Sequence, residues 1–380
     1  MRSAISVLSN EELDRYSRHL LLPSFGAEGQ LKLKSARVLV IGAGGLGSSV
    51  LQYLAAAGVG NIGIVDFDEV RSSNLQRQVL FSEHDLGSAK AYAAVGKLQA
   101  LNSNIEVTPY HFRITSDNIL ELLALYDVVV DATDNFPVRY LINDACVLTG
   151  KPNVYGSISR YEGQVSVFNY TDGASARGPN YRDLFPTPPA EGMIEDCGEG
   201  GVLGALAGVI GSLQAIEVIK VITGIGEVLA GRLLTADLLH HRYMTFDFDC
   251  TAEGRNITSL IDYEEFCKPN NGNGEVRQLS ASELHSMMSS GEEFLLIDLR
   301  EPYEYALVNI GGQLISFDTL QQHPEHLHFT GNIVLHCKHG GRSERAAKEL
   351  ESRFSIKNLY SLQGGIIAYI HEFRPDLPSY

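Results

Sequence analysis

Cys337 lies in a short glycine-rich stretch that could hold a negatively charged sulfur atom. The stretch reads HCKHGGRS, from His336 to Ser343, and it follows the apolar run IVL. Glycines let successive backbone N–H groups point inward as an anion nest, and Lys338 and Arg342 add positive charge. The combination predicts a loop that stabilises a thiolate, or a terminal persulfide anion, on Cys337. The predicted persulfide loop comprises Lys338, His339, Gly340, Gly341, Arg342 and Ser343.

A phosphatase is the alternative for the same loop, since tyrosine phosphatases also place a cysteine and an arginine around an anion. Their loop needs more residues between these two side chains, enough to surround the oxygens of a phosphate group. Only Lys338 to Gly341 lie between Cys337 and Arg342 here. A ring of this size suits a sulfur atom, so the spacing favours sulfur transfer over phosphate ester hydrolysis.

A second glycine-rich stretch, IGAGGLG, lies near the start of the chain. Gly42, Gly44 and Gly47 follow the buried-strand run VLVI and precede the helical run SSVLQYLAAAG, which Gly58 ends. A turn of this kind aims backbone N–H groups and a helix N-terminus at a phosphate group. Asp66 ends the next strand, at the spacing where an acid binds ribose hydroxyls. An NAD-dependent dehydrogenase has the same features, so the glycines alone leave both functions open.

The residues after Asp66 distinguish between these two functions. Cleavage of a triphosphate builds negative charge on phosphate oxygens, which Arg77 and Lys90 could stabilise, whereas hydride transfer leaves a pyrophosphate intact. Asp134 follows another buried strand, in DATDN, and could hold Mg²⁺ against the same oxygens. Further polar side chains of the predicted nucleotide site are Asp68, Asn74 and Gln78.

The elements around these residues predict an α/β chain with a doubly wound, Rossmann-like first domain. Strand patterns at 38–42, 61–68, 105–112 and 126–135 alternate with helix patterns at 48–58, 89–100 and 119–125, which indicates a parallel sheet. After Gly150, alternating β-branched residues predict antiparallel strands, and two more strands follow the apolar segment 202–226. We expect this domain to cover residues 1–250.

A linker and a second, smaller α/β domain are expected after it. Residues 251–276 include KPNNGNGE, whose composition is typical of a linker. Buried-strand runs EFLLIDLRE and GNIVLHCK, the helix SERAAKELESRF and the run NLYSLQGG then predict a separate domain over 277–380.

The bulk composition indicates a soluble cytoplasmic protein. The 380-residue chain has a formal net charge of −16, which argues against nucleic acid because phosphate backbones need clustered Lys and Arg. Five scattered cysteines favour a reducing compartment over a disulfide framework. The N-terminus lacks the apolar core of a signal peptide. Gln214, Glu217 and Lys220 interrupt the apolar segment 202–226, so we expect a buried helix rather than a membrane span.

Several motifs together resemble the MoeB/ThiF family, the bacterial relatives of ubiquitin-activating enzymes. They are RYSRHLLL, GAGGLG, DFDEVRSSNLQRQ, GSAK, DATDN and CGEGGVLGALAGVIGSLQAIEVIK, within residues 10–250. Members adenylate the C-terminal glycine of a small β-grasp protein and release pyrophosphate. The resemblance implies that Asp66 binds the ribose of ATP, that Arg77 and Lys90 contact the phosphates, and that Asp134 serves Mg²⁺. It also implies an ATP cradle formed by Gly42, Gly44, Gly45 and Gly47, with Asn74 beside the phosphates. It further implies a homodimer in which Arg18 reaches the ATP site of the partner subunit.

The cysteines of the first domain differ from the family pattern in one respect. Most members hold a structural zinc with two Cys-x-x-Cys pairs, but this chain has Asn180 and Asp183 at the first pair, and RNITSLID offers no second pair. Zinc prefers four thiolate or imidazole ligands at short spacing, so we expect no zinc site. Cys197 matches a family cysteine on the crossover loop, which implies attack on the acyl-adenylate or a disulfide link during sulfur transfer. Cys146 is expected to be a small buried residue.

Residues 277–375 resemble a single-domain rhodanese, through IDLREPYEYALVNIGG, HCKHGGRS and LQGGIIAY. The resemblance implies that Asp298, Arg300 and Glu301 support the loop. The fusion resembles a known arrangement in which a carrier protein's C-terminal Gly-Gly is adenylated and then receives sulfur from a Cys337 persulfide, forming a thiocarboxylate. Molybdopterin, thiamine and related pathways use such ubiquitin-like carriers, and a cysteine desulfurase or thiosulfate could donate the sulfur. The alternatives are an NAD-dependent oxidoreductase with an accessory rhodanese, or a non-catalytic module that docks a ubiquitin-like protein and senses sulfur.

Overall fold

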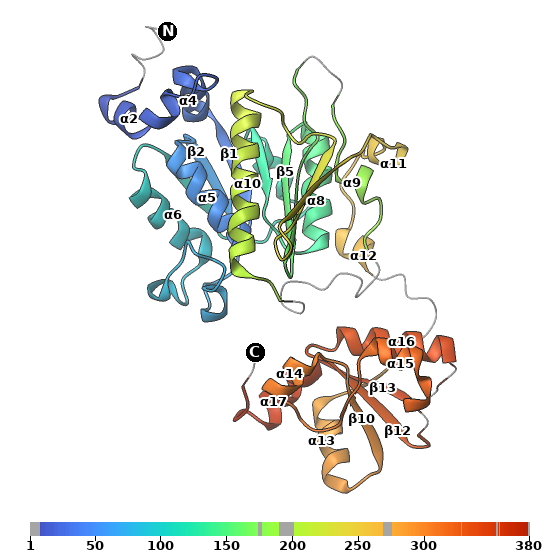
Figure 1. Ribbon diagram of the computed structural model, residues 1–380. Helices are drawn as coiled ribbons and strands as arrows, with labels where there is room; N and C mark the ends of the chain where they lie inside the picture. Colours follow the sequence, from blue (N-terminus) through green and yellow to red (C-terminus); the bar gives the residue numbers. More distant parts are fainter. Residues whose placement is uncertain are drawn as a thin grey trace. The chain divides into compact units, whose positions relative to one another are not determined.

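The chain folds into two compact units, the first reaching Lys268 and the second made mainly of the residues after it. The computed structural model describes residues 8–173, 177–189, 201–268, 276–327, 329–354, 356 and 358–378. Each unit has its own sheet and its own hydrophobic clusters (Figure 1). The predicted α/β fold class is confirmed.

The described strands of the first unit form a single mixed sheet of the order β3-β2-β1-β4-β5-β6-β7-β8. Strands β3 to β5 pair in parallel, and β5 to β8 pair antiparallel, as the sequence predicts. The strands are β1 (Arg37–Ile41), β2 (Asn61–Val65), β3 (Glu106–Tyr110), β4 (Val128–Asp131), β5 (Asn153–Ser159), β6 (Glu162–Phe168), β7 (Arg232–Asp237) and β8 (Arg242–Asp247).

Helices cover both faces of this sheet. Side chains of α5, α6 and α10 join the hydrophobic cluster on one face, and those of α7 and α8 join the cluster on the other; Figure 1 shows α5 and α10 in front of the sheet and α8 behind it. The helices are α2 (Asn10–Arg15), α3 (Ser17–Leu20), α4 (Gly26–Ser35), α5 (Gly45–Ala57), α6 (Lys90–Leu101), α7 (Ile119–Leu123), α8 (Phe136–Thr149), α9 (Tyr181–Leu184), α10 (Gly204–Thr223), α11 (Ala252–Arg255) and α12 (Tyr263–Cys267), with 3₁₀ turns η1 (Ser72–Asn74) and η2 (Glu83–Asp85).

The register of the parallel strands brings the ends of β1, β2 and β4 to one edge. Ile41 at the end of β1 pairs with Val65 of β2 and with Asp131 of β4. The residues that follow these three strands therefore meet above the sheet, where doubly wound folds bind their ligands. This edge positions the glycine-rich loop, Asp66 and the DATDN segment together.

Among the described helices, α10 has the length and the apolar composition that crossing a membrane would require. Its polar residues nevertheless bond within the first unit. Gln214 donates from Nε2 to the carbonyl oxygens of Asp131 (2.8 Å) and Val154 (3.2 Å), and Glu217 accepts the backbone N–H of Leu229 (2.9 Å). These contacts and its place in the core cluster identify α10 as the buried helix that the sequence predicts.

Residues 251–268 lie in the first unit, although the sequence assigns them to the linker. This segment forms the short helices α11 and α12, and Tyr263 is buried in the same hydrophobic cluster as α8. The difference arises because the carbonyl oxygen of Gly254 accepts a bond from Asn180, which caps α9, and the hydroxyl of Tyr263 donates to Asp144 of α8; composition does not reveal such bonds.

The second unit has a five-stranded parallel sheet of the order β11-β10-β12-β13-β9. Its strands are β9 (Arg277–Leu279), β10 (Phe294–Asp298), β11 (Gln313–Leu314), β12 (Asn332–His336) and β13 (Leu359–Leu362). Its helices are α13 (Ala281–Ser290), α14 (Pro302–Leu307), α15 (Phe317–Gln322), α16 (Gly341–Phe354) and α17 (Gly365–Phe373), with the 3₁₀ turn η3 (Pro324–Leu327). Strand β12 leads directly into the Cys337 loop, and α16 follows that loop.

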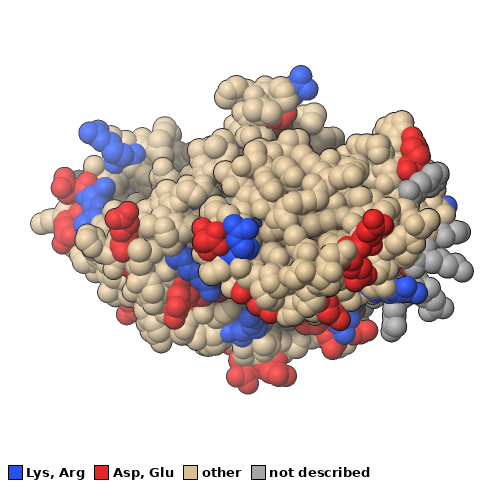
Figure 2. Space-filling view, turned by 90° about the horizontal axis from the view of Figure 1, so that it is seen from below, with Lys and Arg blue, Asp and Glu red and all other residues tan. Residues whose placement is uncertain are grey.

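Charged side chains of both signs are interspersed on the face that Figure 2 shows. Most Lys and Arg side chains in this view lie close to Asp or Glu side chains, and they do not gather into one basic patch. This distribution agrees with the negative net charge of the chain.

Candidate functional sites

The glycine-rich loop after β1 requires glycine at two positions because of backbone crowding. Gly42 has φ of +98°, and a Cβ atom there would lie 2.6 Å from the carbonyl oxygen of Ala132. A Cβ atom at Gly47 would overlap the carbonyl oxygen of Gly42. The space beside Gly44 is open, since the atom nearest to a Cβ built on Gly44 is Nε2 of Gln78, at 3.8 Å. Glycine 44 therefore leaves room for a ligand at the start of α5.

Asp66 is bonded to the glycine loop itself. Its Oδ2 accepts the backbone N–H of Ala43 (2.8 Å), and its Oδ1 accepts that of Asp68 (2.8 Å). Burial raises the pKa of Asp66, against the opposing effects of nearby Lys90 and of these two N–H groups. The carboxylate thus links the ends of β1 and β2 at the edge where a ribose is expected.

Lys90 begins α6 and points back to the end of β2. Its ammonium group lies 3.1 Å from Oδ2 of Asp68, and its side chain is only 6% exposed. The backbone N–H of Lys90 also donates to the carbonyl oxygen of Asp68 (2.8 Å). A cation that is buried and paired in this way is held in place before any anionic ligand arrives.

Arg77 and Gln78 flank the first turn of α5. The guanidinium of Arg77 donates to the carbonyl oxygen of Ser73 (3.1 Å), and the Cγ of Arg77 lies 3.6 Å from the Cβ position of Gly45. Gln78 is 3% exposed, and its Oε1 has no hydrogen-bond partner within the described chain. Asn74 accepts the backbone N–H of Arg71 (3.1 Å) and so closes the turn that carries both side chains.

Two other predicted residues lie differently. Asp134 is exposed, just beyond the end of β4. Arg18 is exposed in α3, and the neighbouring Tyr16 packs on Gly58 at the C-terminal end of α5. Helix α5 has 13 residues, so about 20 Å separates that end from the glycine loop. Within one chain, the structure does not bring Arg18 to the other residues of the predicted nucleotide site.

Asp131 and Arg139 form a buried pair at this edge that the sequence did not single out. Asp131 is fully buried; its Oδ1 accepts bonds from the N–H (3.0 Å) and hydroxyl (2.6 Å) of Thr133, and its Oδ2 lies 4.0 Å from Nε of Arg139. Burial raises the pKa of Asp131, although Arg139 and Thr133 oppose the rise. Because Asp131 ends a buried strand, the sequence gives a reason to select it as a site residue. Asp134, in the same DATDN motif, follows the same strand, so the motif alone does not distinguish the two.

The Cys337 loop surrounds a fully buried sulfur. The backbone N–H of Gly340 donates to Sγ at 3.2 Å, and the hydroxyl of Ser343 lies 3.7 Å from it. Gly340 has φ of +100°, which a residue with a side chain rarely adopts, so the loop requires glycine at this position. Ser343 also bonds to the hydroxyl of Ser361 on β13 (2.9 Å). Within the described chain, the loop therefore places one backbone N–H and one hydroxyl against the sulfur of Cys337, where the sequence predicts a nest of several N–H groups.

The LQGG segment supports this loop from the other side. The backbone N–H of Ile366 donates to the carbonyl oxygen of Cys337 (2.8 Å), and that of Ile367 donates to the carbonyl oxygen of Lys338 (3.2 Å). A Cβ atom at Gly365 would lie 2.5 Å from the carbonyl oxygen of Cys337. The glycine lets the start of α17 approach the loop closely.

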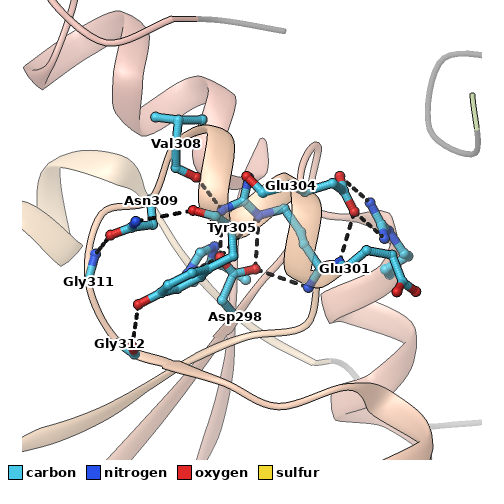
Figure 3. A network of polar contacts seen from close by, with 11 residues as sticks. Asp298, Glu301, Glu304, Tyr305, Val308, Asn309, Gly311 and Gly312 are labelled. Atoms are coloured by element: carbon cyan, nitrogen blue, oxygen red, sulfur yellow. Dashed lines mark hydrogen bonds and ion pairs between the residues drawn. The ribbon is translucent and has the colours of Figure 1, made fainter.

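A network of polar side chains lies beside the loop (Figure 3). Arg300 is fully buried and donates to both carboxylate oxygens of Asp298, from Nε to Oδ1 (2.9 Å) and from Nη2 to Oδ2 (2.6 Å), and it also donates to the carbonyl oxygen of Val308 (2.8 Å). Arg342 makes a second pair, with Glu304 (3.2 and 3.3 Å). The positive charge of Arg342 is therefore shared with a carboxylate that the sequence did not single out.

His336 precedes Cys337 and is fully buried. Its Nε2 lies 3.8 Å from Oδ2 of Asp298. Burial lowers the pKa of His336 to about 4, with Asp298 opposing and Arg300 reinforcing this change. The imidazole is thus neutral near pH 7.

Cys197 lies outside the described residues, so its surroundings are not part of the site described above. Cys146 is fully buried, and burial raises the pKa of its thiol. This agrees with the expected packing role of Cys146.

Comparisons with known proteins identify the family of the first unit. The model of the ThiF family matches residues 16–254. The chain belongs to the ThiF family. The family binds ATP, and a rhodanese-like domain matches residues 280–372. The resemblances to this family and to rhodaneses that the sequence indicates are both confirmed.

Relatives of this chain that have a similar length match it across both domains. The chain is 46% identical to the "Probable adenylyltransferase/sulfurtransferase MoeZ" of Mycobacterium tuberculosis, over 99% of this chain and 97% of that protein. It is 39% identical to the "Adenylyltransferase and sulfurtransferase MOCS3" of Aedes aegypti, over 100% of this chain and 91% of that protein.

Among solved structures, the chain is similar to E. coli MccB with ATP, at 25% identity and a TM-score of 0.53. The likeness covers 62% of this chain and 72% of that chain. A structure of E. coli MccB with an ATP analogue and MccA is similar at the same identity, covering 63% and 72%. Both likenesses support a ThiF-type fold for the first unit.

Proposed function

We propose that this chain adenylates the C-terminal glycine of a ubiquitin-like sulfur-carrier protein and then converts it to a thiocarboxylate with sulfur carried on Cys337. The observation that carries this proposal is the closed donor loop around Cys337 in a chain whose other unit is a ThiF domain. Relatives of nearly the same length, named adenylyltransferase and sulfurtransferase, support both halves of the reaction.

In the first step, a carboxylate oxygen of the carrier's glycine attacks the α-phosphorus of ATP. The bond to the β-phosphate oxygen breaks, and pyrophosphate leaves. Backbone N–H groups at Gly44 and Gly45 would bind phosphate oxygens at the start of α5, and Asp66 would bind the ribose. Arg77 and Lys90 would stabilise the charge that develops on the phosphates. Mg²⁺ supplies further neutralisation when bound, and exposed Asp134 would hold it.

In the second step, the terminal sulfur of a Cys337 persulfide attacks the acyl carbon of the adenylate. The carbon–oxygen bond to AMP breaks, and an acyl disulfide forms on Cys337. A thiol then attacks Sγ of Cys337, the sulfur–sulfur bond breaks, and the thiocarboxylate leaves with both bonding electrons. Cys197 could supply this thiol, which leaves a Cys197–Cys337 disulfide for a cellular dithiol to reduce. Alternatively, Cys197 first forms a thioester by displacing AMP.

The proposal includes the arrangement of the protein. The long separation of Arg18 from the glycine loop in one chain supports a homodimer in which Arg18 acts at the partner's site. We also propose that the second domain covers 277–380, as the sequence predicts, and that the first domain, predicted over 1–250, extends to Lys268. Scattered cysteines support a cytoplasmic location, and a cysteine desulfurase or thiosulfate would load Cys337.

The proposal is tested by ATP–pyrophosphate exchange with candidate carriers that end in Gly-Gly. Exchange should require such a carrier and should fail when its last glycine is deleted. Thiosulfate should then convert the carrier to a thiocarboxylate, detected by mass spectrometry. Exchange that is independent of any carrier, or tight binding of a nicotinamide nucleotide instead of ATP, would contradict the proposal.

A further inference from the structure

Two chain segments far apart in the sequence are joined by hydrogen bonds beside α9. Asp183 accepts the hydroxyl (2.9 Å) and the backbone N–H of Thr251 at Oδ1. Its Oδ2 accepts the backbone N–H (2.7 Å) and the side-chain amide (2.9 Å) of Asn180. The same amide donates to the carbonyl oxygen of Gly254 (2.9 Å). We call these four residues the clasp: Asn180, Asp183, Thr251 and Gly254.

The four residues of the clasp have the spacing of two Cys-x-x-Cys pairs, but their side chains lack the thiolates that bind zinc. Asn180 and Asp183 are separated by two residues, as are Thr251 and Gly254. Zinc binds four ligands, usually thiolates or imidazoles, at about 2.0–2.3 Å. The clasp offers one carboxylate, one amide and one hydroxyl, and Gly254 has no side chain. The described chain also contains no group of three His, Cys, Asp or Glu residues placed to hold a metal ion.

The centre of the clasp is filled by the carboxylate of Asp183. Each of its two oxygens already accepts two hydrogen bonds. A Cβ atom at Gly254 would overlap Oδ1 and lie 2.5 Å from Oδ2, so only glycine fits opposite Asp183. The residues present therefore do not fit a zinc ion, and they satisfy one another instead.

A second buried cluster extends the clasp to α8. Asp144 is 2% exposed and accepts paired bonds from Arg182 (2.7 and 2.8 Å) and one from the hydroxyl of Tyr263 (2.8 Å). The side-chain amide of Asn143 donates to Oδ1 of Asn180 (3.2 Å), which connects the two clusters. Helix α9, the segment 251–254 and α12 are thus all bonded to one another or to α8.

We infer that the clasp is a metal-independent replacement for the family's zinc site, and that it fixes the segment 251–268 to the first unit. The argument rests on the satisfied carboxylate of Asp183 and on the lack of space at Gly254. In the sequence, Asn180 and Asp183 come shortly before Cys197. Thr251 and Gly254 come shortly before the residues that lead toward the second unit. The clasp therefore joins residues 180–183 to residues 251–254 without depending on zinc supply or on the redox state of thiols.

The first test measures metal and stability in the full-length protein. Protein purified after growth with added zinc should contain far less than one zinc ion per chain, and EDTA or 1,10-phenanthroline should leave its melting temperature unchanged. The D183A variant should melt about 3–8 °C lower, because it leaves several buried donors without an acceptor. D117A, at an exposed aspartate of the same unit, is the matched control and should melt like the wild type. Stoichiometric zinc that chelators remove with a fall in melting temperature would overturn the inference.

The second test asks whether the four positions have the geometry of the zinc ligands they replace. The quadruple variant N180C/D183C/T251C/G254C removes the Asp183 carboxylate, and so makes room for a side chain at Gly254. It should bind one Co²⁺ per chain with the absorption bands of a tetrahedral thiolate site, and Zn²⁺ should displace the Co²⁺. The wild-type protein should show no such bands. A folded quadruple variant without these bands, judged by unchanged far-UV circular dichroism, would contradict the proposed replacement.

Discussion

The two terminal guanidinium nitrogens of Arg342 lie 3.2 and 3.3 Å from the two carboxylate oxygens of Glu304. Glu304 is 3% exposed and also accepts the backbone N–H of Glu301 (3.0 Å), so α14 is connected directly to the arginine of the Cys337 loop. The arginine is thereby held at the loop's edge in a fixed orientation. This pair links the stability of the second unit to the shape of its sulfur-binding loop.

Substitution of Glu304 should therefore affect both stability and sulfur transfer. E304Q removes the negative charge that Arg342 bonds in α14, and we expect a loss of about 2 kcal/mol in the free energy of unfolding, the range for hydrogen bonds to charged groups. We also expect slower thiosulfate:cyanide transfer, with ATP–pyrophosphate exchange unchanged. Denaturant unfolding and the two assays check this prediction. E293Q, at an exposed glutamate of the same unit, is the control; an E304Q protein that behaves like E293Q in all three measurements would show that the pair has no such role.

The crowding at Gly47 predicts a selective loss of adenylation. An alanine there would push its Cβ into the carbonyl oxygen of Gly42 and distort the loop at the start of α5. G47A should lose most ATP–pyrophosphate exchange while keeping thiosulfate:cyanide transfer. G96A is the matched control, because nothing lies within 4 Å of a Cβ at Gly96 in α6. Wild-type exchange by G47A would mean that this loop does not bind the nucleotide as proposed.

Arg77 should contribute to adenylation through charge rather than through packing. Its guanidinium donates to the backbone oxygen of Ser73 (3.1 Å), and its side chain lies beside the first turn of α5. R77A should lower exchange by about 100-fold or more, as expected for a group that stabilises transition-state charge. R71A removes a nearby exposed arginine and should have little effect. Equal rates for R77A and R71A would remove Arg77 from the proposed mechanism.

The burial of His336 predicts a pH-dependent stability of the second unit. The unfolded chain protonates this histidine below about pH 6.5, whereas the folded chain does so only near pH 4. The stability is therefore fully present above pH 6.5 and falls as the pH drops toward 4, by about 1.4 kcal/mol per pH unit from this group. Denaturant unfolding of the wild type and of H336Q between pH 7 and 4.5 measures the difference. Parallel curves for the two proteins would show that His336 is not the group responsible.

The sequence predicts the elements that local patterns control. Ser9 and Glu12, three residues apart, form a capping box at the start of α2, and Gly58 ends α5 with φ of +83°. The alternation of strand and helix patterns correctly predicts the parallel half of the sheet, and the β-branched segment predicts the antiparallel half. Glycine spacing likewise places the two loops, because the positive φ of Gly42 and Gly340 is a local property.

Side-chain pairing between distant segments could not be predicted in this way. Glu304 and Arg342 are 38 residues apart, and Asp183 and Thr251 are 68 apart. The first pair determines which acid supports the Cys337 loop, and the second assigns part of the expected linker to the first unit. Asp131 was missed for a related reason, since burial distinguishes it from Asp134 and the DATDN motif does not.

The central claim is that sulfur on Cys337 reaches a glycine carboxylate that ATP has activated. The most direct measurement is the mass of a Gly-Gly carrier after incubation with the full-length protein, ATP, Mg²⁺ and thiosulfate. We predict the mass increase for replacing one oxygen atom with sulfur, and its loss with C337A while ATP–pyrophosphate exchange by C337A continues. Thiocarboxylate formation by C337A at the wild-type rate would contradict the account.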